Sequence, residues 1–268
     1  MQGRLSPASN NRIQFFPQNW EKEFSTAKEM GFSGVTWFLD REIHDFDPIQ
    51  DVWAKDAFLE RIDAARAALP IHSIDCGLYS MFGPDMEQTR EDFAVLLPAL
   101  APRLTSRVVC VPMLEETTPK TEQEKKDARE TLTIITAIAA QNNLRIALET
   151  EMPADELAAY IDSFGSPSIG VCYDTGNCTS YGFDAASDIT KLGSRVFEVH
   201  LKDRKIGSNQ SVYLGKGDTK FEACFRALKQ ISYTGGYTIQ AWRGNDQIAD
   251  ATTQLQFVTN LLAQTNEK

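Results

Sequence analysis

Short apolar runs alternate with longer amphipathic segments along this whole chain, and this alternation limits the folds open to it. The runs with the length and composition of strands are residues 2–5, 34–39, 71–76, 107–112, 145–149, 169–174, 195–201 and 237–241. The segments with a helical spacing of apolar residues are 20–31, 54–69, 87–104, 122–142, 153–164, 185–192, 221–231 and 247–264. Such strict alternation predicts a parallel sheet whose strands are connected by helices.

Eight strand–helix units within 268 residues predict a sheet that closes on itself. The length is ordinary for one α/β barrel, and we see no linker that would divide it. An open, doubly wound sheet is the alternative, but no glycine-rich phosphate loop follows any predicted strand. We therefore expect a single (β/α)8 TIM barrel over residues 1–268. Within its third helical segment, Pro98 should kink or split the helix.

Polar residues stand at the ends of four successive predicted strands, where such a barrel places its chemistry. They are Glu149, Asp174, His200 and Gln240. Because side chains alternate along a strand, the residues two positions earlier should also face the barrel interior. Those residues are Ala147, Cys172, Glu198 and Thr238. All four terminal groups therefore point into the mouth, where oxygen and imidazole ligands suit one divalent metal ion. Glu198 is irregular, since a buried carboxylate needs a partner.

Composition excludes several classes of protein. The net charge of −10 disfavours a nucleic-acid partner, because binding phosphates requires clustered Lys and Arg. No apolar run approaches the ~20 residues that cross a bilayer, so we expect no membrane partner. The five cysteines show no CxxC spacing, and the sequence carries no signal peptide. We therefore expect reduced thiols and a cytoplasmic location.

Several segments carry a resemblance that covers nearly the whole chain. They are MQGRLSP, IQFFPQNWEKEF, AKEMGFSGVTWFLD, IALE, VCYDTGN, VHLKDR, LGKGD and GGYTIQAWRG. With them the sequence resembles the xylose isomerase-like barrels, specifically the sugar phosphate isomerase/epimerase family. The resemblance implies that Glu149, Asp174 and His200 are metal ligands. We expect one divalent ion, Mn²⁺ first, with Mg²⁺, Co²⁺ and Zn²⁺ as alternatives.

Three positions depart from the pattern of that family. Most members carry a Glu where Gln240 stands, and that Glu serves as both ligand and acid/base. A glutamine can coordinate through its amide oxygen, but it cannot accept a proton at neutral pH. Thr36 stands where many relatives have a Glu, and Asn177 stands where some epimerases have a substrate-binding His. These changes leave a metal site with Gln240 as its fourth ligand and put the reaction itself in question.

The implied reaction is proton abstraction next to a carbonyl, through an enediolate, on a sugar or sugar phosphate. Glu149 is the expected base. Return of the proton to the neighbouring carbon would interconvert aldose and ketose, and return to the opposite face would invert a stereocentre. Because Gln240 replaces a carboxylate, two-base epimerisation is disfavoured, whereas one-base isomerisation or a second acid such as Glu151 fits.

Cationic and amide side chains near the strand ends are expected to bind substrate oxygens or a phosphate. They are Arg4, Asn177, Lys202, Arg204 and Arg243. Arg243 lies just beyond the eighth strand, and late loops of such barrels often bind phosphate. His72 begins the third strand, far from its mouth.

Other functions also exist on this fold. Metal-dependent nucleases of the fold use several zinc ions and many histidines, so three histidines and an acidic chain argue against that class. A catalytically silent sugar-binding protein stays open, because fold and function are separable. So does a lyase or dehydratase acting on a related polyol or keto acid. Barrels of this kind often form dimers or tetramers, so the sequence also allows a homo-oligomer.

Overall fold

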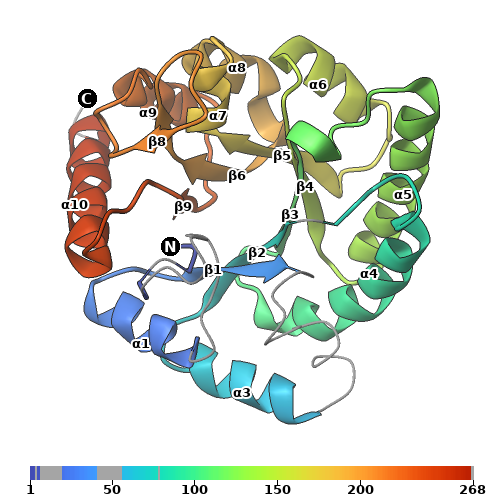
Figure 1. Ribbon diagram of the computed structural model, residues 1–268, viewed down its shortest axis with the longest axis horizontal. Coiled ribbons are helices and arrows are strands. Elements are labelled where there is room, and N and C mark those ends of the chain that lie inside the picture. The colour runs from blue at the N-terminus through green and yellow to red at the C-terminus, as the bar shows by residue number, and fades with distance from the viewer. Residues whose placement is uncertain (4, 7–19, 41–55, 78, 267–268) are drawn as a thin grey trace.

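The strands form a nearly closed parallel barrel surrounded by helices (Figure 1). The structure is a computed structural model that describes residues 1–3, 5–6, 20–40, 56–77 and 79–266. The strands, in their order around the sheet, are β1 (Val35–Asp40), β2 (Ile71–Gly77), β3 (Val108–Met113), β4 (Arg145–Thr150), β5 (Ile169–Asp174), β6 (Val196–Leu201) and β9 (Tyr237–Ile239). Every neighbouring pair is parallel, so all strand C-termini meet at one end, as the alternation predicted.

The N-terminus occupies the gap between β1 and β9 (Figure 1). The Met1 carbonyl accepts a hydrogen bond from the Thr36 amide at 2.9 Å, and the Met1 amino group donates to the Gly34 carbonyl at 3.2 Å. Inside the barrel, Oγ1 of Thr36 lies 2.7 Å from Oγ1 of Thr238. These contacts link the first and last strands of the sheet.

The predicted first strand over residues 2–5 is not found. Gln2, Gly3 and Leu5 belong to no strand, and Arg4 lies outside the described residues. Gly3 has a φ of 44°, a left-handed conformation that turns the chain away after Gln2. The main sheet has seven strands in the described part of the chain.

Helices cover the outside of the barrel (Figure 1). They are α1 (Glu21–Glu29), α3 (Asp56–Arg66), α4 (Met86–Leu100), α5 (Glu122–Gln141), α6 (Ala154–Asp162), α8 (Ala185–Leu192), α9 (Phe221–Gln230) and α10 (Gln247–Asn266). The sequence predicted all of them within a few residues. The start of α5 shows why: Thr121 and Glu124 form a reciprocal capping box. None of the described helices is both long and apolar enough to cross a membrane.

Helix α4 does not split at Pro98 as expected. It continues to Leu100 and then tightens into a 3-10 turn, Ala101–Arg103. Pro98 cannot donate a hydrogen bond to the carbonyl of Ala94, and the α-helix ends two residues after it. The break therefore comes after Pro98.

Two elements at the mouth have no counterpart among the predicted ones. Helix α7 (Thr175–Ser180) follows β5 directly, and a small hairpin of β7 (Asp203–Arg204) and β8 (Ser211–Val212) follows β6. Both are too short to produce a periodic apolar pattern. They matter because they carry side chains that surround the strand ends.

The barrel interior contains both apolar and polar side chains. Ala147 and Cys172 pack inside with Val108 and Cys110, as the predicted alternation requires. Glu198 is fully buried, and Thr238 donates a 2.7 Å hydrogen bond to it. The interior is therefore filled by side chains.

Candidate active site

The C-terminal ends of five strands bring polar side chains to the mouth of the barrel. Four of these were predicted: Glu149 on β4, Asp174 on β5, His200 on β6 and Gln240 directly after β9. The fifth is Asp75, near the end of β2. All five side chains are buried, so each needs a partner.

Three of these side chains form the tightest group of donors. Asp75, Glu149 and His200 each place one ligand atom within 4.8 Å of the other two. The His200 Nδ1 atom lies 3.3 Å from Glu149 Oε2. Asp75 Oδ1 has no hydrogen-bond partner among the residues that the structure describes, and the contact printed for His200 Nδ1 is the one with Glu149. Because orphaned buried polar atoms cost free energy, these carboxylate and imidazole donors fit a divalent cation.

The pKa of Asp75 also indicates that the protein only partly stabilises the charge of this carboxylate. Burial raises this pKa to about 7, against the opposing effect of His200. The negative charge of Glu149 raises it further, while the Gln2 amide and the Lys202 ammonium lower it. The surrounding protein groups therefore do not fully stabilise a second carboxylate here, which a cation would do.

Gln240 meets Asp75 across the mouth. Its Nε2 donates to Asp75 Oδ2 at 3.2 Å, and the Gln2 amide donates to the same oxygen. The side chain of Gln240 thus lies at the site, where it acts as a hydrogen-bond donor. Its predicted role as a metal ligand stays a prediction.

Asp174 forms hydrogen bonds through one carboxylate oxygen and an ion pair through the other. Its Oδ1 accepts the amides of Gly176 and Asn177 at 2.9 and 2.7 Å and thereby caps α7. Its Oδ2 lies 2.8 Å from the Lys202 ammonium. Burial raises the pKa of Asp174, but Lys202 and His200 outweigh that effect and lower it overall. Asp174 is therefore held as an anion by the protein itself.

Two predicted substrate-binding residues, Asn177 and Lys202, lie inside the mouth. Asn177 Nδ2 donates to Glu149 Oε1 at 2.6 Å, and the Lys202 ammonium lies 3.4 Å from Asn177 Oδ1. A Cβ at Gly176 would approach the Lys202 backbone to 2.8 Å, so glycine permits this contact between α7 and β6. A chain from Lys202 through Asn177 thus fixes the orientation of Glu149.

The predicted arginines have different environments. Arg243 is buried and donates to the Ser6 carbonyl at 2.7 Å, so it fastens the N-terminal segment. Arg204, on β7, is half-buried, and its Nε atom has no hydrogen-bond partner within the described ranges. Arg4 lies outside those ranges. The Nε atom of Arg243 also lacks a hydrogen-bond partner in the described part of the chain, so the predicted roles of Arg4, Arg204 and Arg243 at substrate oxygens all stay predictions.

Glu151, the alternative acid, lies at the rim of the mouth. Its Oε1 accepts the Tyr181 hydroxyl at 2.6 Å and the Glu115 amide at 3.0 Å, and Thr118 lies 3.4 Å from its Oε2. It is absent from the donor group of Asp75. The geometry therefore gives Glu151 a role in holding the loops together.

The LGKGD segment has a structural role around a fully buried carboxylate. Asp203 Oδ2 accepts the amides of Gly215 and Gly217, each at 2.8 Å, and its Oδ1 accepts the Thr219 amide at 3.2 Å. A Cβ at Gly217 would lie 2.0 Å from Asp203 Oδ1, so this position requires glycine. The motif shapes the loop beside β7.

Sequence reasoning missed Asp75, although a signal was present. Asp75 stands one residue before the end of the strand predicted over 71–76, and it shares its parity with the polar Ser73. The prediction considered only the residues that end the last four strands, and Asp75 is not one of these. Ser73 and Asp75 are both buried in the interior, as that parity implies.

A second donor group lies on the other side of His200. Cys110 and Cys172 lie within 4.8 Å of it, and Cys110 Sγ is 3.8 Å from His200 Nε2. Burial raises the pKa of the Cys172 thiol well above its usual value. Because thiolates rather than thiols bind metals, this group is the poorer cation site.

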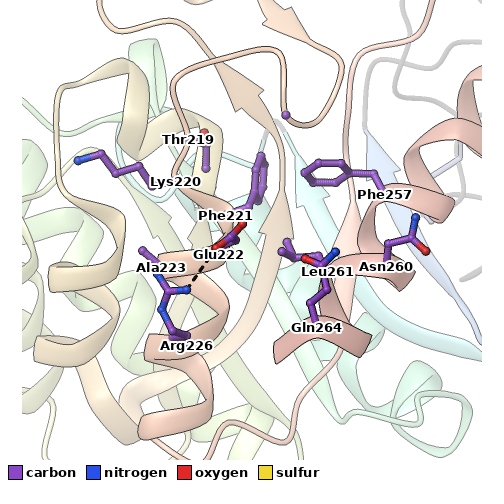
Figure 2. Close-up of a pocket in the computed structure, with 11 residues that line it drawn as sticks. Thr219, Lys220, Phe221, Glu222, Ala223, Arg226, Phe257, Asn260, Leu261 and Gln264 are labelled. Carbon is purple, nitrogen blue, oxygen red and sulfur yellow. Dashed lines mark hydrogen bonds and ion pairs between the residues drawn. The ribbon is translucent and has the colours of Figure 1, made fainter. Parts of the chain in front are cut away.

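A groove of about 620 Å³ lies outside the barrel, between α9 and α10 (Figure 2). Phe221 and Phe257 form its apolar wall with ring centroids 5.4 Å apart, and Arg226 pairs with Glu222 at 3.4 Å. None of the strand-end side chains lines it. The chemistry predicted for this chain therefore belongs to the mouth.

Comparison with protein families gives one extensive match. The family described as "Xylose isomerase-like TIM barrel" matches residues 24–261. That range includes β1 to β9 and every strand-end residue of the mouth.

Curated relatives match over shorter stretches. The chain is 28% identical over 109 residues to a ketose 3-epimerase from Arthrobacter globiformis, which is 41% of this chain and 36% of that protein. It is 26% identical over 152 residues to an inosose dehydratase from Clostridium tetani, which is 48% of this chain and 51% of that protein. The chain thus spans about half or less of these relatives.

Solved structures share the fold over nearly the whole chain. The 3-keto-D-glucoside 4-epimerase YcjR from E. coli has a TM-score of 0.71 at 19% identity, over 93% of this chain and 97% of that one. A barrel from Mycobacterium smegmatis in complex with magnesium has a TM-score of 0.70 at 16% identity, over 92% and 89%. At these identities the likeness establishes the fold alone.

Proposed function

Because this chain belongs to the family of xylose isomerase-like TIM barrels, we propose that it is a divalent-metal-dependent isomerase or epimerase of a sugar or sugar phosphate. The observation that carries the proposal is the meeting of Glu149 and His200 in the mouth, beside Asp75 Oδ1, a buried oxygen without a hydrogen-bond partner in the described part of the chain. The epimerases among the similar proteins support it.

Glu149 and His200 belong both to the predicted ligand set and to the donor group with Asp75. A divalent cation bound by them would supply Lewis acidity for negative charge that develops on a substrate carbonyl oxygen. We propose Mn²⁺ first and Mg²⁺, Co²⁺ or Zn²⁺ as alternatives, since carboxylate and imidazole donors suit them all. The magnesium complex of a similar barrel supports a divalent ion.

The base in this proposal is Glu149. It removes the proton from the carbon next to the substrate carbonyl, so that the electrons of the C–H bond form an enediolate. Return of the proton to the neighbouring carbon, together with transfer of the hydroxyl proton from one substrate oxygen to the other, interconverts aldose and ketose. Asn177 holds one Glu149 oxygen at 2.6 Å, which fixes the carboxylate for this transfer.

One-base isomerisation is the form of the reaction that the geometry supports best. Inversion of a stereocentre normally needs a proton-carrying group on each face of the substrate. Gln240 cannot accept a proton, and Glu151 is bound at the rim by Tyr181. Glu149 therefore carries the proton transfer alone.

The proposed partner is a small sugar or sugar phosphate, held by Asn177, Lys202 and Arg204. A net charge of −10 disfavours nucleic acid. The five cysteines are free and buried, which supports a reducing compartment such as the cytoplasm. A homo-oligomer stays a prediction.

Replacement of Glu149 by Gln tests this function. With a panel of aldoses, ketoses and their phosphates in D₂O, we expect the variant to incorporate solvent deuterium about 10²–10⁴-fold more slowly, because it lacks the general base. The matched control is Glu130→Gln, an exposed glutamate on α5, which should exchange at the wild-type rate. Exchange retained in Glu149→Gln would exclude Glu149 as the base.

The similarity to an inosose dehydratase favours a second candidate, a lyase acting on a related polyol or keto acid. It would use the same proton abstraction by Glu149 and then expel a hydroxyl group. The two functions differ in the product. A product lighter by one water assigns the lyase, and a product of unchanged mass assigns the isomerase.

A further inference from the structure

We infer that the N-terminal end of the barrel, opposite the mouth, carries a binding site for a phosphate group, with Arg145 as its anchor. The site is a cavity of about 390 Å³, a volume typical of sites for small ligands. Its ligand is inorganic phosphate or a small phosphate monoester, which share this group. The site is separate from the proposed metal site and stands whether or not the mouth binds a cation.

Three strand starts and two turns line the cavity. His72 is the second residue of β2, Arg145 is the first of β4, and Val196 is the first of β6. The 3-10 turn Gly193–Arg195 leads into β6, and the loop over residues 231–236 leads into β9. Because the strands are parallel, their starts lie together at the end of the barrel away from the proposed active site.

Arg145 brings a positive charge without an ion pair to this cavity. Its guanidinium lies over the Phe197 ring, 4.4 Å from the ring centroid, and its Nη2 donates to the Ser106 carbonyl at 3.4 Å. Among the described residues it pairs with no carboxylate, and its Nε and Nη1 atoms make no hydrogen bond. The stacked ring holds the guanidinium plane, so the unused N–H groups form a fixed fork of the kind that binds phosphate oxygens.

The charge lining the cavity is opposite in sign to that of the whole chain. The chain carries a net charge of −10, yet none of the described residues that line the cavity is an aspartate or a glutamate. Glu198, the carboxylate that His72 contacts at 3.2 Å, is fully buried and does not line the cavity. Its other oxygen accepts Thr238 and Ser73. An anion in the cavity therefore meets a cation and no exposed carboxylate.

Neutral donors surround the same cavity. Ser194, Ser232 and Thr234 are exposed on its wall, and their hydroxyls make no hydrogen bond within the described part of the chain. The amides of Thr234, Gly235 and Gly236 also make none there. Free hydroxyls and amides beside an arginine are suited to an oxyanion. A phosphate group offers three acceptor oxygens, so it uses more of these donors than a carboxylate does.

The test is binding of inorganic phosphate to the full chain, measured by isothermal titration calorimetry. We expect Arg145→Gln to bind phosphate about 10–100-fold more weakly than wild type, because it loses the charged hydrogen-bond donors. The matched control is Arg129→Gln, since Arg129 also lies over a phenylalanine, Phe164 at 4.6 Å, but does not line the cavity. This control should bind as wild type. An equal loss in both variants overturns the inference.

A charge placed at Ser232 keeps the test decisive if Arg145→Gln folds poorly. Ser232 has a φ of 57°, a conformation that Asp and Asn adopt more readily than most residues. We expect Ser232→Asp to weaken phosphate binding at least about 10-fold, because its carboxylate repels the anion and competes for Arg145. Ser232→Asn has the same shape without the charge and should bind within about 3-fold of wild type. Equal affinities in the two folded variants overturn the inference.

The remaining comparisons separate this site from the mouth and identify the ligand. Loss of phosphate binding in Arg204→Gln, with binding kept in Arg145→Gln, places the anion at the mouth and overturns the inference. So does acetate that binds as tightly as phosphate, or a wild-type chain that binds no phosphate at millimolar concentrations. Tighter binding of glycerol phosphate than of inorganic phosphate identifies a monoester as the ligand, and the reverse order identifies the free ion.

Discussion

Buried carboxylates at the two ends of the barrel interior differ in how completely they are hydrogen-bonded. Near the N-terminal ends of the strands, Glu198 Oε1 accepts Thr238 Oγ1 at 2.7 Å and Ser73 Oγ at 3.4 Å, and Oε2 lies 3.2 Å from His72 Nε2. We call this group of Glu198, His72, Ser73 and Thr238 the floor. At the mouth, Asp75 Oδ1 has no such partner among the described residues.

The difference separates structure from function within one barrel. A buried carboxylate with a partner on each oxygen is stable by itself and needs no ligand. One that keeps a free buried oxygen costs free energy until something binds it. The floor is therefore a structural network, whereas the mouth has the features expected of the proposed cation site.

The largest expected effect on stability comes from breaking the floor. Glu198→Ala should lower the free energy of unfolding by about 3–5 kcal/mol, because it leaves His72 and the two hydroxyls without their shared acceptor. Urea unfolding followed by circular dichroism measures this. The exposed control Glu130→Ala should change stability by less than about 0.5 kcal/mol. A loss below about 1 kcal/mol in Glu198→Ala would mean that the floor is not structural.

The next effect concerns the mouth, which should gain stability from its ligand. At a Mn²⁺ concentration about 100 times Kd, the free energy of unfolding should rise by about 2.7 kcal/mol, because the ion binds the folded chain alone. Removal of the ion with a chelator should reverse the gain. The comparison is thermal unfolding with and without Mn²⁺, with His200→Ala as the control that should show no shift. An equal shift in both proteins would place the ion elsewhere.

Much of this comparison could be predicted from the sequence. Strand alternation and side-chain parity placed Glu149, Asp174, His200 and Gln240 at the mouth, and they marked Glu198 as a buried carboxylate in need of a partner. Those signals are periodic, so a single chain displays them. The helices were equally predictable, because each presents an apolar face over several turns.

The contacts that decide function were not predictable in the same way. Parity gives the direction of a side chain but not its partner across the barrel, so the pairing of Asp174 with Lys202 and of Glu198 with His72 appeared only in three dimensions. Helix α7, which Asp174 caps, is too short to leave a periodic signal. The turn at Gly3, which ends the expected first strand, depends on a single φ angle.

The smallest expected effect tests how closely the floor is packed. A Cβ at Gly236 would lie 2.1 Å from His72 Nε2, so Gly236→Ala must push that ring away from Glu198. We expect a loss of about 1–2 kcal/mol in the free energy of unfolding, at the lower end for overpacking because the His72 side chain is 25% exposed and can swing outward. Thr234→Ala, an exposed change in the same loop, is the control for urea unfolding.

A double-mutant cycle makes this last test specific to the His72 contact. In a His72→Ala background the added methyl group meets no ring, so Gly236→Ala should then cost less than about 0.5 kcal/mol. Deuterium exchange into substrate should stay at the wild-type rate in Gly236→Ala, because the floor holds Glu198 and not the base Glu149. If exchange fell with stability unchanged, the two ends of the barrel would be coupled, and the division between a structural floor and a binding mouth would fail.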